Sequence, residues 1–373
     1  MLESLEKLVR AESPSLDKAL CDACAEEVAD LFIQRTGGRM VWHRNSERGD
    51  VLEVRIARGE GSADPGEAGD RGRRGILVLC HHDTVWDAGT IERLPFRVEG
   101  DRVTGPGCYD MKAGIVQTAF ALEGARPRLP VTVLSTPDEE IGSGVSRPLI
   151  EDRARQSVAV LVLEPATSGG AIKTARKGIA DYAIRVHGRA AHAGVEPEKG
   201  LSAIEELARV VLRLKALADR SMGTTINVGV VRGGTRPNVV AAFAEAEVDV
   251  RFAVRSEMER VLPAIQGLKP ELDGVRIEVE GGLDRPPMER SEGVARLARL
   301  AQQLARELGF ELRESSTGGG SDGNFTAALG VPTLDGLGPD GGGAHADSEH
   351  LLVSSWIQRT QLLQRLLERL PVA

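Results

Sequence analysis

The stretch Gly75 to Trp86, GILVLCHHDTVW, places two histidines and a carboxylate directly after a short apolar run. The run Ile76 to Leu79 is typical of a buried central strand, and no turn residue separates it from the polar group that follows. Side chains alternate along a strand, so His81 and Asp83 point the same way and His82 points the other. His81 is therefore the better candidate for a metal ligand, with Asp83 holding its second ring nitrogen. On these residues alone, the alternative is a polar strand end that faces solvent.

Acidic residues and a further histidine follow the other expected strands of the same domain. They are Asp110 in GPGCYDMKAG, Asp138, Glu139 and Glu140 in TPDEE, Glu164 in LEP, and His345 in GGGAHADSEH. In open parallel sheets, sites lie outside the carboxyl ends of the strands, so these residues are expected to converge. Two imidazoles and several carboxylates exceed the needs of one tetrahedral zinc and suit two metals that share a bridging carboxylate. Each acid taken singly would be explained by a helix cap or a solvent-facing position, but the set indicates a metal site.

The elements that must position these residues alternate between strands and helices. Strands are expected at 51–57, 131–135 and 158–163, with helices at 16–36 and 111–123. This alternation predicts an α/β domain whose mixed, largely parallel sheet is covered by helices. The polar, glycine-rich segment 58–74 is interpreted as a loop that carries no part of the site.

A second pattern interrupts the first. It consists of a strand at 179–186, a helix at 202–217, strands at 224–231 and 239–252, a helix at 257–268 and a strand at 275–280. This order is that of a ferredoxin-like α+β domain, with Gly178 and Gly281-Gly282 as its expected hinges. The first pattern then resumes with helices at 293–308 and 355–370. The predicted division is therefore a catalytic domain formed by 1–177 and 286–373, with residues 178–285 inserted as a dimerisation or lid domain.

Composition narrows the class of protein. A chain of 373 residues suggests two domains, and a net charge of −8 with mixed signs argues against nucleic acid or an anionic membrane as the main partner. The N-terminus lacks the features of a signal peptide and no apolar run has the length of a membrane span, so the expected location is the cytoplasm. The four cysteines form no disulfide framework, and Cys21 and Cys24 are interpreted as small helix residues rather than as a metal or redox pair.

Taken in order, the motifs resemble those of the dizinc family of aminoacylases, succinyl-diaminopimelate desuccinylases and glutamate carboxypeptidases. HHDTV, GPGCYDMKAG, TPDEE, LEP, GRAAHAG, GGGSD and the late histidine carry the resemblance, from about residue 75 to the C-terminus. PFRVEGDRVTGPG, LEPATSGG and STGGGSDGNF look most like bacterial glutamate carboxypeptidases that act on folate-type conjugates. Asp110 is followed by Met-Lys, as in the wider family, rather than by a second acid.

The resemblance implies two zinc ions per subunit, with other divalent metals as an alternative. His81 and Glu164 would hold one ion, Glu140 and His345 the other, and Asp110 would bridge them. Asp83 would orient His81, and the peptide after Asp110 would be cis. Glu139 would act as general base, taking a proton from a bridging water to give hydroxide and returning it to the leaving amine. His192, in GRAAHAG, would donate to the developing oxyanion.

The implied substrate is a small molecule, an acyl or peptidyl amino acid with a free carboxylate. Arg285 in GGLDRPPM would bind that carboxylate through its fork of N–H groups. Further substrate positions implied by the resemblance are Asn238, Arg251, Gly319 and Gly320, and less closely Lys173, Arg176 and Lys177.

The favoured function is hydrolysis of the amide bond of a C-terminal acidic residue. The alternatives are deacylation or desuccinylation of an N-acyl amino acid, and a non-catalytic zinc-binding homologue, which the presence of Glu139 disfavours. The exposed edges of the inserted domain, together with the resemblance, predict a homodimer in which His192 serves the opposite chain.

Overall fold

The computed structural model describes residues 1–57 and 75–371, which form two compact units. The first unit comprises Met1–Ala175, Arg290–Thr317 and Ser321–Ala373, and the second Arg176–Glu289 with Gly318–Gly320. The inserted domain expected at 178–285 falls within the second unit. The loop expected at 58–74 lies outside the described residues.

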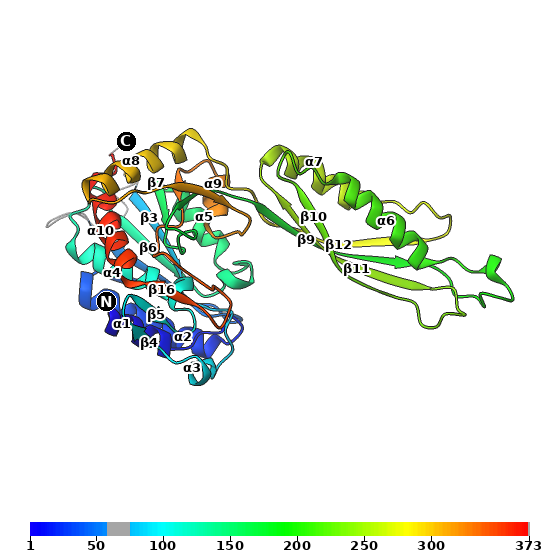
Figure 1. The fold of residues 1–373 in the computed structure, drawn as a ribbon, viewed down its shortest axis with the longest axis horizontal. Helices are drawn as coiled ribbons and strands as arrows, with labels where there is room; N and C mark the ends of the chain where they lie inside the picture. The colour runs from blue at the N-terminus through cyan, green and yellow to red at the C-terminus, as the bar shows by residue number, and fades with distance from the viewer. Residues whose placement is uncertain (58–74, 372–373) are drawn as a thin grey trace. The chain divides into compact units, whose positions relative to one another are not determined.

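A mixed six-stranded sheet forms the centre of the first unit (Figure 1). Its strand order is β1-β2-β6-β3-β7-β14. The central strand β3 (Gly75–His81) pairs in parallel with β6 (Val131–Thr136) and β7 (Ser157–Val162), and β14 (Thr333–Leu334) pairs in parallel with β7. At the other edge, β2 (Val51–Ile56) and β1 (Arg39–His43) are antiparallel. The predicted α/β class with a mixed sheet is confirmed.

Alternation along β3 divides its side chains between two cores. Ile76, Val78 and Cys80 belong to one apolar cluster, whereas Leu77 and Leu79 belong to the other. Both faces of the sheet are therefore covered, as its continuous apolar strands require. The helices of this unit are α1 (Leu2–Arg10), α2 (Lys18–Thr36), α3 (Thr90–Arg93), α4 (Ala113–Gly124), α5 (Arg147–Arg155), α8 (Glu292–Glu307), α9 (Gly323–Ala328) and α10 (Val353–Arg369). Among the described residues, no helix has both the length and the hydropathy needed to cross a membrane.

The helix predicted at 16–36 is present as α2, and local chemistry sets both of its ends. Asp17 accepts a hydrogen bond from the backbone N–H of Leu20, and Gly37 ends the helix in the left-handed conformation with φ of 62°. Cys21 and Cys24 are buried in this helix as free thiols. Their interpretation as small helix residues agrees with this placement.

The structure contains several short strands that the sequence did not predict, and they form two further small sheets. One small sheet has the order β15-β16-β5-β4, formed by β15 (Gly341–Gly342), β16 (His350–Leu352), β5 (Arg102–Thr104) and β4 (Arg97–Glu99). Another joins β13 (Glu314–Thr317) to β8 (Ile172–Arg176). Strands of two to five residues carry too few positions to show an alternating pattern, so sequence periodicity does not reveal them.

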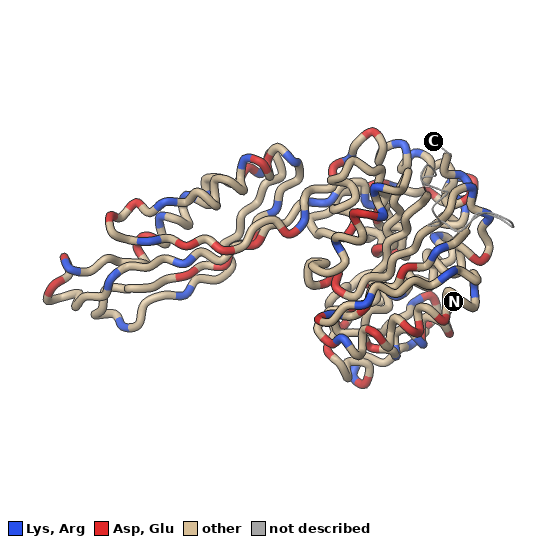
Figure 2. Tube along the Cα trace, turned by 180° about the vertical axis from the view of Figure 1, so that it is seen from behind, with Lys and Arg blue, Asp and Glu red and all other residues tan. Residues whose placement is uncertain are grey.

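The second unit is a four-stranded antiparallel sheet in the order β10-β11-β9-β12, with two helices. Its elements follow the ferredoxin-like sequence β9 (Gly178–His187), α6 (Ala203–Leu217), β10 (Thr225–Gly233), β11 (Phe243–Phe252), α7 (Arg255–Gln266) and β12 (Arg276–Arg285). Alternate residues of β9, including Tyr182 and Ile184, join the helices in one core. Acidic and basic residues are interspersed along the strands (Figure 2), and Arg185 pairs with Glu280 at 2.6 Å on the opposite face.

Gly281 and Gly282 lie inside β12 and do not end it as a hinge would, so that expectation is wrong. Gly281 has φ of 104°, and a Cβ atom at this position would lie 2.1 Å from the carbonyl oxygen of Asp181. Glycine is needed at this position because the backbone of β9 lies too close for a side chain. Strand β12 continues beyond the two glycines to Arg285.

Candidate metal centre

Three parallel strands deliver acidic and imidazole groups to one edge of the central sheet. His81 is the last residue of β3, and Glu164 lies two residues beyond β7. Glu139 and Glu140 follow β6 on the 3₁₀ turn η2 (Glu139–Ile141), and Asp110 lies in the turn η1 (Cys108–Lys112). The ends of β3, β6 and β7 meet because these strands are neighbours and run in the same direction. The structure thus brings together the acidic and imidazole residues that were predicted to follow the strands.

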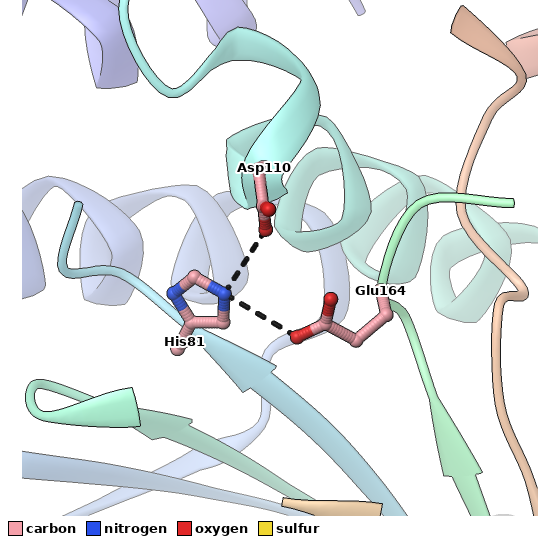
Figure 3. A group of neighbouring side chains, drawn as sticks. All are labelled: His81, Asp110 and Glu164. Atoms are coloured by element: carbon pink, nitrogen blue, oxygen red, sulfur yellow. Dashed lines mark ion pairs between the residues drawn. The ribbon is translucent and has the colours of Figure 1, made fainter. Parts of the chain in front are cut away.

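The first cluster consists of His81, Asp110 and Glu164 (Figure 3). Nε2 of His81 lies 3.4 Å from Oδ1 of Asp110 and 3.4 Å from Oε1 of Glu164. His81 is only 1% exposed, and among the described residues this Nε2 makes no hydrogen bond. A buried nitrogen that faces two carboxylates without hydrogen bonding to either is suited to a cation between them.

The second cluster consists of Asp110, Glu140 and His345. Nε2 of His345 lies 3.5 Å from Oδ2 of Asp110 and 3.2 Å from Oε2 of Glu140. Asp110 therefore uses one carboxylate oxygen for each cluster. Within the described part of the chain, Oε1 of Glu140 is buried and makes no hydrogen bond.

The distances in both clusters fit a zinc ion better than they fit hydrogen bonds. Ligand atoms at about 2.0–2.1 Å from a tetrahedral zinc are about 3.3–3.4 Å from each other. The nitrogen–oxygen separations at His81 and His345 range from 3.2 to 3.5 Å, whereas hydrogen bonds to charged groups are about 2.7–2.9 Å long. Imidazole nitrogens and carboxylate oxygens are also the donors that zinc binds. The residues present fit two metals that share Asp110.

Electrostatics at the two clusters favour a bound cation. The Asp110 and Glu140 carboxylates that face its ring raise the pKa of His345 to about 10, and burial together with the Asp110 charge raises the pKa of Glu140 to about 7. Burial opposes protonation of His81, but its carboxylate neighbours outweigh that effect and raise its pKa well above 6.5. The clusters attract positive charge, which protons or metal ions can supply.

Asp83 is held where it can orient His81. Its carboxylate accepts hydrogen bonds from Ser15 Oγ at 2.7 Å and from the backbone N–H groups of Glu139 and Glu140 at 3.3 and 3.2 Å. Nδ1 of His81 lies 3.0 Å from the carbonyl oxygen of Asp83 and 3.4 Å from its Oδ1. Burial raises the pKa of Asp83, but these partners, led by His81, bring it below its usual value. His82 points away and contacts Ser135 at 3.0 Å.

Glu139 and Asp138 stand outside both clusters. Glu139 is half-buried on the turn that carries the ligand candidate Glu140. Asp138 is buried and turns back toward its own loop, where it accepts hydrogen bonds from Ser146 Oγ and from the backbone N–H of Val145 at 2.7 Å. Asp138 therefore shapes the loop that presents the two glutamates.

Comparison with known proteins now identifies the family. The sequence matches peptidase family M20/M25/M40 over residues 77–369. The chain belongs to this family of metallopeptidases. It is 32% identical to carboxypeptidase G2 from Pseudomonas sp. (strain RS-16) over 98% of this chain and 88% of that protein.

Two further comparisons extend over 98% or more of this chain. The chain is 26% identical to succinyl-diaminopimelate desuccinylase from Thioalkalivibrio sulfidiphilus (strain HL-EbGR7), over 100% of this chain and 99% of that protein. The fold is similar to that of aminopeptidase PepT from Bacillus cereus ATCC 10987, with a TM-score of 0.77, 20% identity, and coverage of 98% and 96% of the two chains. The peptide between Asp110 and Met111 is cis, as the resemblance to the family implied.

Several of the expected substrate residues of this M20 enzyme meet at one end of the second unit. Arg251 of β11 and Arg285 of β12 flank Ile179 of β9 from its two sides. Arg285 is buried, and a Cβ atom at Gly320 would lie 2.8 Å from its Cδ. The carbonyl oxygens of Gly319 and Gly320 accept hydrogen bonds from Arg176, whereas Lys173 lies in β8 of the first unit and Lys177 precedes β9.

His192 and Asn238 meet at the other end of the second unit. Both are exposed, and the carbonyl oxygen of Asn238 accepts a hydrogen bond from the backbone N–H of Ala193 at 3.0 Å. Nδ1 of His192 accepts a hydrogen bond from the backbone N–H of Gly194 at 3.2 Å. The residues that the resemblance implied for substrate binding therefore form two groups at opposite ends of the same sheet.

Proposed function

We propose that this M20 enzyme is a dizinc carboxypeptidase-like amidohydrolase that releases a C-terminal acidic residue from a small acylated or peptidyl substrate. The observation that carries the proposal is the pair of clusters joined by Asp110, one with His81 and Glu164 and the other with Glu140 and His345. The whole-length similarity to carboxypeptidase G2 supports the choice of carboxypeptidase chemistry.

Each residue near the clusters is assigned one role in the hydrolysis. Bound zinc ions supply Lewis acidity, which acidifies water and polarises the amide carbonyl. Glu139 takes the proton of the attacking water and returns it to the nitrogen of the leaving amino acid, because it lies beside the clusters without belonging to either. Asp83 holds the tautomer that presents Nε2 of His81 to the metal.

Arg285 is proposed to bind the free carboxylate of the leaving residue. Its guanidinium is kept in place by burial and by the close approach of Gly320. Two parallel N–H groups match the two carboxylate oxygens, so the amide bond is placed a fixed distance from the anchor. Arg251 lies at the same end of the sheet on β11, on the far side of β9, where it pairs with Asp249 at 2.6 Å.

His192 is proposed to donate to the developing oxyanion in the active site of a second subunit. Strand β9 is ten residues long. Arg285 of β12 lies beside the first residues of β9, and the chain continues from the last residue of β9 toward His192. At about 3.3 Å per residue the two ends of β9 are about 30 Å apart, too far for both side chains of one chain to contact the same small substrate. A homodimer through the second unit resolves the difficulty. Exposed apolar residues on α6 and β10 support such an interface, among them Ile204, Leu212 and Val231.

A substrate screen tests the proposed function. Metal-free protein is reconstituted with zinc and assayed against N-acyl-glutamate, N-acyl-aspartate, neutral N-acyl amino acids and N-succinyl-diaminopimelate. Release of glutamate or aspartate at rates well above the other substrates supports the proposal. A preference for the succinylated substrate would place the enzyme with the desuccinylases. Absence of zinc-dependent turnover on every substrate, with two zinc ions bound, would overturn it.

A further inference from the structure

Glu349 is a buried carboxylate beside the metal clusters that belongs to neither of them. It is 2% exposed and lies directly before β16. The antiparallel pairing of β16 with β5, in which His350 lies opposite Thr104, brings Glu349 next to the turn 107–110. Two short strands distant in sequence thereby fix its position.

Four N–H groups converge on the Glu349 carboxylate. Oε1 accepts hydrogen bonds from the backbone N–H groups of Tyr109 at 2.9 Å and Asp110 at 3.1 Å. Oε2 accepts from the backbone N–H of Gly107 at 2.9 Å and from the indole Nε1–H of Trp86 at 2.8 Å. A carboxylate has about four acceptor sites, so all of them are used. The turn forms a concave backbone site for an anion, with Gly107 in the left-handed conformation at φ of 69°.

These contacts join the segments that carry two of the candidate metal ligands. Glu349 holds the backbone of Asp110, whose two carboxylate oxygens face His81 and His345. Glu349 also lies four residues after His345, in a segment closed by hydrogen bonds from Glu349 N–H to the Ala346 carbonyl and from Ala346 N–H to Gly343. One side chain therefore fixes the bridging carboxylate relative to the histidine of the second cluster.

We propose that Glu349 is a positioning residue that sets the metal affinity of the cluster formed by Asp110, Glu140 and His345. The inference rests on the proposed dinuclear site and adds to it a residue outside the ligand set. An outer group that orients a ligand contributes about tenfold to a hundredfold in metal affinity. The effect is greatest at the second cluster, because Glu349 is attached to both Asp110 and the segment of His345.

An amide cannot replace this carboxylate. In Glu349→Gln the side-chain NH₂ would face at least one pair of N–H donors, because each oxygen of Glu349 accepts two of them. The substitution preserves size and removes charge and acceptors. If Glu349 only filled space, Glu349→Gln would keep the zinc affinity of the wild type. If Glu349 positions the ligands, the zinc affinity falls.

Glu206 offers a matched control in the second unit. It is fully buried and accepts hydrogen bonds from the backbone N–H groups of Glu271 at 3.0 Å and Leu272 at 2.8 Å. Glu206→Gln makes the same chemical change at a carboxylate that also holds a loop but contacts no candidate ligand. Both variants are expected to lose thermal stability, and only Glu349→Gln is expected to lose metal affinity.

The test measures zinc binding to folded, metal-free protein by competition with a chelating dye, below the melting temperature of each variant. Glu349→Gln should weaken the second zinc by tenfold or more and alter the visible spectrum of the cobalt-substituted protein, while Glu206→Gln should match the wild type in both. Equal zinc affinities and cobalt spectra for wild type and Glu349→Gln would overturn the proposal. If Glu349→Gln does not fold, Trp86→Phe removes one of the four donors, and an unchanged zinc affinity in that variant would overturn it. Wild-type protein that fails to bind a second metal would instead refute the dinuclear site itself.

Discussion

Mixed dimers can show whether the site is shared between two chains. The perturbation uses two single variants, Glu139→Ala and His192→Ala, each expected to be inactive. Refolding them together in equal amounts makes half of the dimers mixed. A mixed dimer has one site with both residues intact when His192 serves the opposite chain, so roughly a quarter of all sites should recover activity. The length of β9, about 30 Å between the Arg285 end and the His192 end, is the structural reason for expecting this outcome.

A second mixture provides the control. Wild-type chains are refolded with the double variant Glu139→Ala/His192→Ala. Shared sites leave activity only in wild-type homodimers, roughly a quarter of the dimers, whereas sites within one chain would leave roughly half of the activity. The assay is release of the amino acid from the best substrate of the screen, after subunit exchange is verified with tagged chains. Activity near zero in the first mixture together with half in the second would refute the reasoning.

Three other predictions concern the base, the anchor and acid stability. Glu139→Gln should lower kcat by several orders of magnitude and keep two bound metals, because Glu139 belongs to neither ligand cluster; metal loss measured by elemental analysis would contradict it. Arg285→Ala should raise KM for a carboxylate-bearing substrate more than for its amidated analogue, and Arg285→Lys should restore only part of the difference; equal losses on both substrates would remove Arg285 from the carboxylate pocket. Burial raises the pKa of Glu53, but hydrogen bonds led by Arg153 outweigh it and hold it at about 2, from 4.5. Because the folded pKa is the lower one, this stabilisation is present above pH 4.5 and lost as pH falls toward 2, with about 2 kcal/mol of the free energy of unfolding lost between pH 7 and 3. Urea unfolding at both values should show a smaller pH dependence in Glu53→Gln, and an equal dependence would contradict the assignment.

The parts of the fold with a periodic signal could be predicted from the sequence. The apolar run before His81 identified the central strand, and the order of elements in the second unit matched a ferredoxin-like domain. Parallel strands then explain why residues as far apart as His81 and Glu164 meet, because their strand ends share one edge of the sheet.

The surroundings of the clusters could not be predicted in the same way. Ser15 reaches Asp83 from a segment that shows no motif, through a bridge between Pro14 and Thr84. Glu349 lies in a polar stretch, DSEH, that is typical of an exposed loop, and only the pairing of three-residue strands buries it. The strength of such a contact depends on long-range pairing rather than on local pattern.

The buried carboxylates of the first unit differ in the number of hydrogen-bond donors around them, and this difference indicates which of them position the site and which would bind metal. Asp83 and Glu349 accept hydrogen bonds from N–H or O–H donors and so hold backbone and side chains in place. The carboxylate oxygens of Asp110 face the imidazoles of His81 and His345 at 3.4 and 3.5 Å, distances that are long for hydrogen bonds to charged groups. A buried charge without close donors is costly unless a cation compensates it. Asp83 and Glu349, which accept several hydrogen bonds, therefore position the site. Asp110, which lacks close donors in the described part of the chain, keeps a negative charge that two metal ions would share.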